Sequence, residues 1–270
     1  MNQKRIKRVL LCRPNYFQVD YIINPLMEPF SVDRPRALKQ WDELVKTYES
    51  LGIKVEVIEQ QPDVPDMVFA VDCGIVTDGS VLLANFRHRQ RRHERQYYRR
   101  WFREHGFGLR ALSNVHYFEG GDARFFGEKL FVGTGFRASR DSCEELGKKL
   151  NVEVIPIEII NPNYYHLDMG FLPLTDNTAF YYPAAYSADS REIFKRHVPE
   201  LLELTDRAAK DYAGNSITSG KDIITQCSDP DFLKELDRHG FKVHQVDVDE
   251  FNKAGGGIRC MTNVLEWEEL

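Results

Sequence analysis

"LGIKVEVIEQ", at residues 51–60, sets the pattern on which the fold prediction depends. A glycine ends a helical stretch, and apolar and polar residues then alternate as they do in a half-buried strand. The same order, with Gly or Asn at the turn, recurs at residues 105–114, 150–159 and 239–248. A weaker copy, around 200–205, follows a helical segment near 187–197. The copies lie roughly 50 residues apart, so about five fit in the chain.

Each repeat also contains short strands between its helix and the next repeat. These strands are expected at residues 80–86, 128–135, 178–183 and 221–226. Several small units with one helix each favour radial repetition in a propeller-like α/β closure, because that arrangement leaves few open sheet edges. An ordinary mixed α/β sheet is the alternative. No linker or change in composition divides the chain, so residues 1–270 are expected to form a single catalytic domain.

Composition limits the classes of function. The 270 residues include 36 Lys and Arg and 41 Asp and Glu, a net charge of −5, which argues against a dedicated nucleic-acid binder. The apolar run at residues 9–12 is too short for a signal peptide or a membrane span, so we expect a cytoplasmic protein without a membrane partner. The five cysteines include no CxxC pair, which disfavours a zinc knuckle or a dithiol redox motif.

Four stretches carry polar residues where a buried strand would be apolar. They are "PDMVFAVDCGIV" (65–76) with Asp72, "FEGGDARFF" (118–126) with Glu119 and Asp122, "YYHLDMGFLPL" (164–174) with His166 and Asp168, and "GGGIRC" (255–260) with Cys260. If His166 and Asp168 lie on a strand, their side chains share one face. Carboxylates, a histidine and a cysteine in apolar surroundings are costly to bury unless they line a common cavity. The set therefore predicts a cysteine nucleophile, a histidine base and a cationic substrate.

Each stretch also has a structural explanation. Glu-Gly-Gly-Asp is a common turn, a lone histidine is usually a hydrogen-bonded core residue, and most free cysteines are small buried hydrophobes. A metal site is a further alternative. The sequence contains no HxxxH or HExxH motif, and the spacing of these residues is not that of a common zinc site. We therefore predict no metal.

The motifs "PDMVFAVD", "FEGGD", "HLD" and "GGGIRCMT", in this order, resemble those of the guanidino-group modifying superfamily. This superfamily contains arginine deiminases, dimethylarginine dimethylaminohydrolases, glycine amidinotransferases and arginine dihydrolases. The N-terminal "NYFQVDYIINPLMEP" is similar to the dihydrolase and dimethylargininase-like group, and the resemblance spans essentially the whole chain. It implies a five-bladed α/β propeller with pseudo-fivefold ββαβ-type repeats, and an enzyme that requires no cofactor.

The resemblance also implies roles for individual residues. Cys260 is the expected nucleophile, His166 the general acid and base, and Glu119 completes the catalytic set. Asp168 and Asp72 are expected to bind the guanidinium nitrogens. Three further residues are expected to bind the rest of the substrate: Arg87 and Arg91 its α-carboxylate, and Asn24 as a lining residue of the pocket.

The implied reaction is hydrolysis of a small guanidino substrate through a covalent S-alkylthiouronium intermediate. A carboxylate at Asp72 suits a charged guanidinium better than a neutral ureido group, which favours a single hydrolysis of arginine or a methylarginine to citrulline. The alternatives are an arginine dihydrolase, which would release ornithine, CO2 and ammonia, and an amidinotransferase. The sequence leaves the oligomeric state open, a homo-oligomer included.

A non-enzymatic alternative comes from the arginine-rich stretch at residues 87–103. Arginines interleaved with aromatic residues can bind single-stranded RNA. The same pattern fits an amphipathic helix whose aromatic residues pack inward and whose arginines are solvated or paired with Glu94 and Glu104. The acidic remainder of the chain favours the second interpretation, so no nucleic-acid partner is expected.

Overall fold

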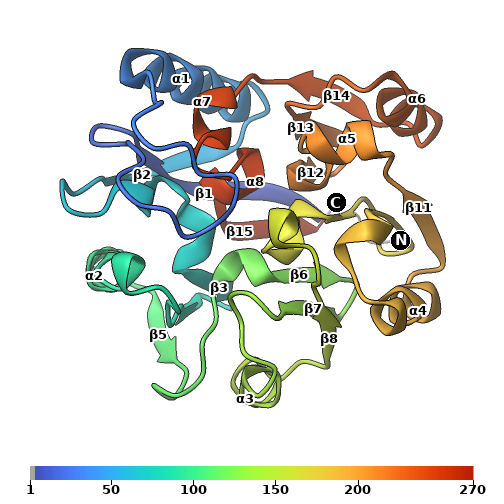
Figure 1. Ribbon diagram of the computed structural model, residues 1–270, viewed down its shortest axis with the longest axis horizontal. Coiled ribbons are helices and arrows are strands. Elements are labelled where there is room, and N and C mark those ends of the chain that lie inside the picture. The colour runs from blue at the N-terminus through green and yellow to red at the C-terminus, as the bar shows by residue number, and fades with distance from the viewer. Residues whose placement is uncertain (1–3, 270) are drawn as a thin grey trace.

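The computed structural model describes residues 4–269, which form five three-stranded sheets arranged around a central axis (Figure 1). The first sheet contains β3 (Gly74–Thr77), β4 (Ser80–Leu83) and β5 (Gly108–Ala111), and the second contains β6 (Ala123–Phe126), β7 (Lys129–Thr134) and β8 (Val154–Glu158). The third contains β9 (Phe171–Pro173), β10 (Thr178–Tyr181) and β11 (Glu200–Glu203), and the fourth β12 (Ile217–Ser219), β13 (Asp222–Thr225) and β14 (Lys242–Gln245). The fifth joins β15 (Asn263–Glu269), β1 (Lys4–Arg13) and β2 (Lys54–Glu59).

All five sheets have one construction. The first strand pairs antiparallel with the second, and the second pairs parallel with the third. A helix connects the two parallel strands in every blade: α2 (Glu94–Glu104), α3 (Ser142–Leu150), α4 (Ala188–His197), α6 (Pro230–Arg238) and α1 (Arg34–Ser50). The predicted ββαβ-type repeat and the five-bladed α/β propeller are therefore confirmed. Since the fifth sheet pairs strands from both ends of the chain, it closes the ring of blades.

Helix α1 shows how the repeat signal arises. Asp33 caps the helix by accepting a hydrogen bond from the backbone N–H of Arg36, and Pro35 lies in the first turn. Gly52 follows the helix with φ +72°, a conformation that L side chains rarely adopt, and β2 begins at Lys54. The buried face of α1 includes Trp41 and Leu44, which pack in the core formed with the fifth sheet. The helix–glycine–strand order thus marks the third strand of a blade.

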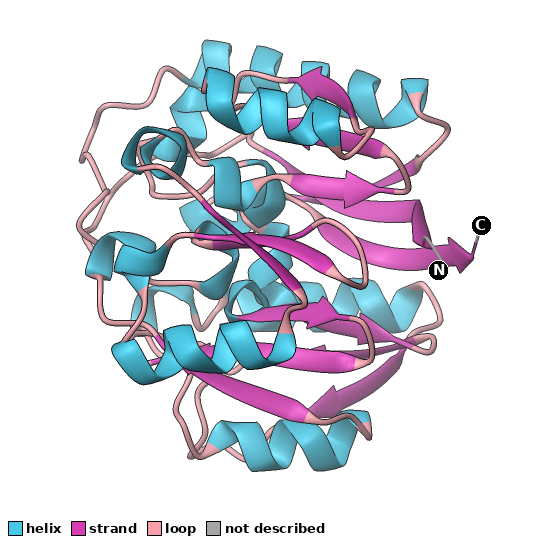
Figure 2. Ribbon diagram, turned by 90° about the vertical axis from the view of Figure 1, so that its right-hand side faces the viewer, coloured by secondary structure: helices cyan, strands magenta, loops and turns pink. Residues whose placement is uncertain are grey.

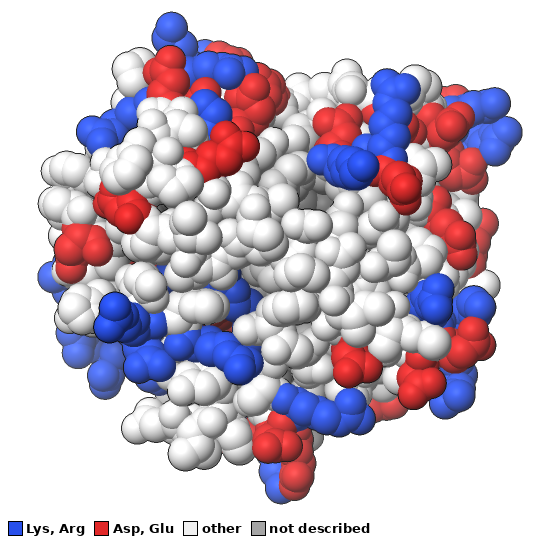
Figure 3. Space-filling view, in the orientation of Figure 1, with Lys and Arg blue, Asp and Glu red and all other residues white. Residues whose placement is uncertain are grey.

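Helix α2 contains most of the arginine-rich stretch. Tyr98, Trp101 and Phe102 are buried in the core beneath it, as expected for an amphipathic helix. The arginines at 99, 100 and 103 are exposed, and basic side chains gather on the side of the molecule where α2 lies (Figure 3). Near the central axis, the face of the molecule that Figure 3 shows carries few charged side chains. Among the described residues, no helix is long and apolar enough to cross a membrane.

Short helical turns occupy one end of the propeller, and both chain termini lie at the other (Figure 2). The turns are η1 (Pro65–Val68), η2 (Ala70–Cys73), η3 (Arg89–Arg91), η4 (Gly120–Asp122), η5 (Pro162–Tyr164), η6 (Leu167–Met169), η7 (Pro183–Ala185), η8 (Ala213–Asn215), α5 (Asp206–Lys210), α7 (Asp249–Asn252) and α8 (Ile258–Met261). His166 is the N-cap of η6 and Asp168 lies within it, so neither residue belongs to a strand, and the shared strand face considered from the sequence does not occur.

Candidate active site

One short turn per blade places a polar residue close to the axis. The turns η2, η4, η6, η8 and α8 each precede the first strand of a blade, and each contacts the turns of the two neighbouring blades, so that they close a ring. Each turn carries one such residue, one to three positions before the strand that follows. These residues are Asp72, Asp122, Asp168, Asn215 and Cys260. The pseudo-fivefold repeat therefore gathers side chains that lie far apart in the sequence.

Cys260 lies in α8 with its sulfur among polar atoms. Its Sγ accepts a hydrogen bond from Asn215 Nδ2 at 3.2 Å and lies 3.9 Å from both carboxylate oxygens of Asp168. The backbone N–H of Cys260 donates to Asn215 Oδ1 at 3.2 Å, so the amide of Asn215 fixes both ends of the cysteine. The residue is only 2% exposed. The helical turn α8 thus holds Cys260 inside the ring.

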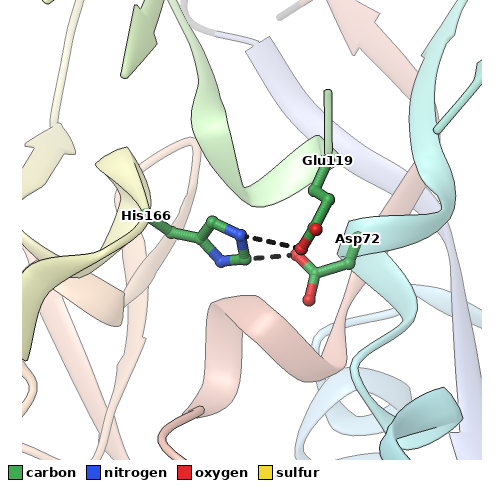
Figure 4. A group of neighbouring side chains, drawn as sticks. All are labelled: Asp72, Glu119 and His166. Carbon is green, nitrogen blue, oxygen red and sulfur yellow. Dashed lines mark hydrogen bonds and ion pairs between the residues drawn. The ribbon is translucent and has the colours of Figure 1, made fainter. Parts of the chain in front are cut away.

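His166 is held between two carboxylates (Figure 4). Its Nε2 lies 3.1 Å from Glu119 Oε2, and its Nδ1 lies 3.6 Å from Asp72 Oδ1. Glu119 caps η4, where its side chain accepts a hydrogen bond from the backbone N–H of Asp122. Three blades thus supply one His–carboxylate cluster.

The charges in this cluster stabilise one another. Burial opposes ionisation of His166, but the carboxylates of Asp72 and Asp122 outweigh it and raise the pKa of the imidazole well above its usual value. Burial would also raise the pKa of Glu119, but the guanidinium of Arg137 and the imidazole of His166 lower it below the ordinary range. Burial, with Asp168 adding to it, raises the pKa of the Cys260 thiol to about 11. Without a substrate, the site therefore holds a protonated imidazole, an ionised Glu119 and a neutral thiol.

Two glycines allow the backbone to approach these side chains. A Cβ on Gly121 would lie 2.7 Å from both Asp72 Oδ1 and His166 Nδ1, so only a glycine fits between them. Gly255 has φ +88°, and a Cβ there would lie 2.7 Å from Asn24 Oδ1. The glycines of "FEGGD" and "GGGIRC" are thus explained by close packing as well as by turn geometry.

The remaining predicted site residues occupy different positions. Asn24 is buried and donates to the carbonyl of Ala254, beside the glycines that precede Cys260. Arg91 is buried, and its Nη1 donates to Asp72 Oδ2 at 2.6 Å while its Nε and Nη2 donate to Glu94. Arg87 is exposed, with its guanidinium over the ring of Tyr117. The structure therefore brings Arg91 and Asn24 to the site, and leaves Arg87 on the surface.

Comparison with known proteins agrees with this arrangement. Residues 13–266 match the family profile described as eukaryotic N,N-dimethylarginine dimethylhydrolase. The chain is also 32% identical to the N(G),N(G)-dimethylarginine dimethylaminohydrolase of Mycobacterium tuberculosis, over 96% of this chain and 85% of that protein.

The chain belongs to the dimethylarginine dimethylaminohydrolase family.

The protein is also similar to a bifunctional enzyme. The chain is 35% identical to the arginine dihydrolase/ornithine cyclodeaminase ArgZ of Synechocystis over 94% of this chain, but it spans only 37% of the length of ArgZ. The crystal structure of the N-terminal domain of ArgZ with bound substrate superposes with a TM-score of 0.93 at 34% identity, and the match covers 96% of this chain and 97% of that domain. The shared region is therefore the propeller alone.

Three residues of the site were not predicted from the sequence. Arg137 donates to Glu119 Oε2 at 3.2 Å, and its guanidinium stacks on the ring of Tyr165. Asp66 is buried in η1 behind Arg91, with its Oδ1 unpartnered. Asn215 is the third. It was detectable in principle, because "GNSIT" occupies the place in its repeat that "GDARF" occupies in another.

One group of residues could hold a metal ion. Ligand atoms of Asp72, Glu119 and His166 lie within 4.8 Å of one another. In this structure the three atoms face one another as an imidazole held by two carboxylates, and a metal would have to displace the proton of His166. The cluster thus offers metal ligands, and among the described residues only Nε2 of His166 has a hydrogen-bond partner, whereas its buried Nδ1 has none.

Replacing Asn215 with leucine, which is similar in size, is expected to lower kcat by about 10-fold to 100-fold. The change removes the N–H that points at the sulfur of Cys260 and would stabilise its thiolate. The measurement is kcat and KM for arginine, together with the pH profile of kcat, which should shift to higher pH. A matched control is Asn85→Leu, because Asn85 donates to a surface-loop carbonyl outside this ring. An unchanged pH profile for Asn215→Leu would contradict the assigned role.

Proposed function

We propose that this protein is a cysteine-dependent hydrolase of arginine or a methylarginine, which it converts to citrulline through an S-alkylthiouronium intermediate on Cys260. The observation that carries the proposal is the convergence of Cys260, His166, Glu119, Asp168 and Asp72 on one point from four blades. Family membership supports the same class of hydrolase, which acts on carbon–nitrogen bonds of linear amidines. Residues 1–270 would act as one catalytic domain, with a small guanidino compound as substrate.

The carboxylates suit a planar cation. Asp168 lies 3.9 Å from the sulfur of Cys260, and Asp72 lies 3.6 Å from Nδ1 of His166, so each can accept N–H groups from a guanidinium bound between them. A substrate gripped by both edges presents the face of its central carbon to the sulfur. Because Asp72 also accepts hydrogen bonds from Arg91 and from the Gly121 backbone, its orientation is fixed before the substrate arrives.

The substrate itself would ionise the nucleophile. The thiol has a pKa of about 11 in the empty site, mainly because it is buried. A guanidinium bound between Asp168 and Asp72 neutralises their charge and adds a cation beside the sulfur, which lowers the pKa of the thiol. The protonated imidazole of His166 acts in the same direction.

The reaction then balances in two steps. The thiolate adds to the guanidinium carbon, His166 protonates one nitrogen, and the C–N bond breaks to release ammonia or an alkylamine. His166, now neutral, removes a proton from a water molecule that attacks the S-alkylthiouronium carbon. The C–S bond breaks, the thiolate leaves, and citrulline is released. Overall, arginine and water give citrulline and ammonium.

The distal part of the substrate needs a cation for its α-carboxylate. Arg91 remains our candidate within the site, and Arg87 is the candidate nearer the surface. All three nitrogens of Arg91 already donate to protein acceptors, so a substrate carboxylate would have to replace Glu94 or Asp72 as its partner. Burial raises the pKa of Glu94 to about 8, and a neutral Glu94 would release Arg91 for this purpose.

A second candidate function is an arginine dihydrolase. The similarity to the N-terminal domain of ArgZ, described as an arginine dihydrolase, favours it. In that reaction a second thiolate attack, on the neutral ureido group, would release ornithine. The carboxylates of Asp72 and Asp168 suit the charged guanidinium better than the neutral ureido group, which favours stopping at citrulline.

Product analysis distinguishes these functions. The protein is incubated with arginine, monomethylarginine or dimethylarginine, and citrulline, ornithine, ammonia and alkylamines are quantified. Citrulline in equal amount to the released amine supports single hydrolysis, and ornithine with two equivalents of ammonia supports the dihydrolase. If neither product appears with any of the three substrates, the proposed substrate class is wrong.

The free thiol is expected to titrate at high pH. Because the pKa of Cys260 is raised, its thiolate fraction and its alkylation rate should keep rising from about pH 7 to about pH 10 without a plateau near neutrality. A guanidine that binds without reacting should increase the thiolate absorbance at neutral pH. A plateau in the alkylation rate of the free protein below about pH 8 would contradict substrate-assisted ionisation.

A further inference from the structure

A cavity opens at the end of the axis opposite to the catalytic ring. It has a volume of about 950 Å³, and the turns and strand ends of all five blades line it, on the face where both termini lie (Figure 2). Charged residues of both signs, including Lys4, Asp78, Asp176 and Lys221, are exposed at its rim. Deeper in the wall lie two arginines, Arg124 and Arg259.

Neither of these two arginines has a carboxylate partner. Within the described chain, no Asp or Glu oxygen lies within 4.0 Å of the guanidinium of Arg124 or Arg259. Arg124 is only 8% exposed. Its Nη2 donates to the carbonyls of Gly214 and Ser216, and its buried Nε has no hydrogen-bond acceptor. Arg259 uses its Nη1 for the carbonyl of Thr262 and its other nitrogens for no described residue.

Guanidinium groups without a carboxylate partner destabilise the fold when they are buried, unless another negative charge compensates them. A buried cation is normally paired, because desolvation of an isolated charge costs several kcal/mol. The buried arginines Arg91 and Arg137 near the axis each have a carboxylate partner, whereas the buried Arg124 and the half-buried Arg259 have only carbonyl oxygens. Burial and the neighbouring Arg259 lower the pKa of Arg124 to about 9, which reflects the missing counter-charge.

We propose that this cavity binds a small multivalent oxyanion, such as phosphate or a dicarboxylate, on the guanidinium groups of Arg124 and Arg259. Guanidinium groups bind both kinds of oxyanion through paired charge-assisted hydrogen bonds, and the unpartnered nitrogens supply the donors. The positive and negative charges at the rim partly cancel, so the two arginines dominate the electrostatic potential in the deeper part of the cavity.

The site lies directly behind the catalytic ring. Arg259 precedes Cys260 in the chain, and the charges of Asp168 and of the Cys260 thiolate both act on Arg124 and Arg259. An anion bound on the two arginines would neutralise the positive charge behind the sulfur, and so disfavour its thiolate. This coupling rests on the proposed function, whereas the binding itself does not.

Calorimetric titration tests the binding. Inorganic phosphate and malonate are titrated into the protein, with sodium chloride at matched ionic strength as the control. We expect saturable binding of one anion per chain, and at least about tenfold weaker binding in Arg124→Gln and in Arg259→Gln. Lys221→Gln, at the rim, is the matched control and should bind as the unchanged protein does. Arg259→Gln loses a single hydrogen bond, and it decides the question if Arg124→Gln does not fold.

Three results would overturn the proposal: no saturable heat with either anion, unaltered affinity in Arg259→Gln, or equal losses in Lys221→Gln and Arg259→Gln. If the apparent Kd of the anion rises without limit as arginine is added, the two compete for the catalytic site, and this result would also overturn the proposal. If arginine is hydrolysed, phosphate should lower kcat without raising KM, and this effect should disappear in Arg259→Gln. Should arginine not be a substrate, the titration alone still decides whether the second site exists.

Discussion

Replacement of Cys260 with serine is expected to lower kcat for arginine by at least about 1,000-fold. The sulfur is the only described nucleophile within reach of both Asp168 and Asn215. A serine hydroxyl has a far higher pKa than a thiol, so a bound guanidinium cannot ionise it, and the first step stops before a covalent bond forms. Because serine is nearly the same size and can keep the contact with Asn215, KM should change little. The measurement is steady-state release of ammonia and citrulline.

Cys227→Ser is the matched control for this change. Cys227 is equally buried, but it packs in another part of the core, where its sulfur faces the carbonyl of Ala208. This variant should keep kcat within about a factor of two while matching the structural disturbance. Residual kcat above one tenth in Cys260→Ser, with a native melting temperature, would mean that another group attacks the substrate.

Replacement of His166 with asparagine is expected to lower kcat by about 100-fold to 10,000-fold. The imidazole is protonated in the resting site, so it is ready to donate a proton to the departing amine. Glu119 and Asp72 also hold it from both sides, at 3.1 Å from its Nε2 and 3.6 Å from its Nδ1. Asparagine can keep a hydrogen bond to Glu119, but it cannot transfer a proton in either step. Stopped-time assays of ammonia release measure the effect.

A second histidine provides the control for this variant. His244 also pairs with a carboxylate, Asp222, at 2.7 Å, but it lies on β14 outside the catalytic ring. His244→Asn should leave kcat unchanged. If His166→Asn loses less than about tenfold while remaining folded, proton transfer by His166 is not part of the rate-limiting chemistry.

The propeller was predictable because its signal is local. A helix, a glycine or asparagine with a left-handed or turn conformation, and an alternating strand recur in each blade, as at Gly52 and Asn151. The copy at residues 200–203 was weak in sequence, and it is still the third strand of its blade, because pairing with β10 stabilises it where its own pattern does not. Pairing between strands from the two ends of the chain is not local, and only the repeat count implied it.

The site was predictable only in part. Cys260, His166, Glu119, Asp168 and Asp72 stood out because charged or reactive residues interrupt apolar runs. Arg137 follows a strand like any surface arginine, and its burial on Tyr165 depends on contacts between blades. The local conformation of His166 and Asp168 could not be predicted, because two residues of alternation do not distinguish a strand from a short helical turn.

The most direct test of the covalent mechanism is mass spectrometry of the protein quenched with acid during turnover of arginine. The account predicts an adduct on Cys260 whose mass equals that of arginine minus ammonia, located by peptic digestion and absent from Cys260→Ser. Turnover at full rate with no adduct on Cys260 at any quench time, and with full activity retained after Cys260 is alkylated, would contradict it.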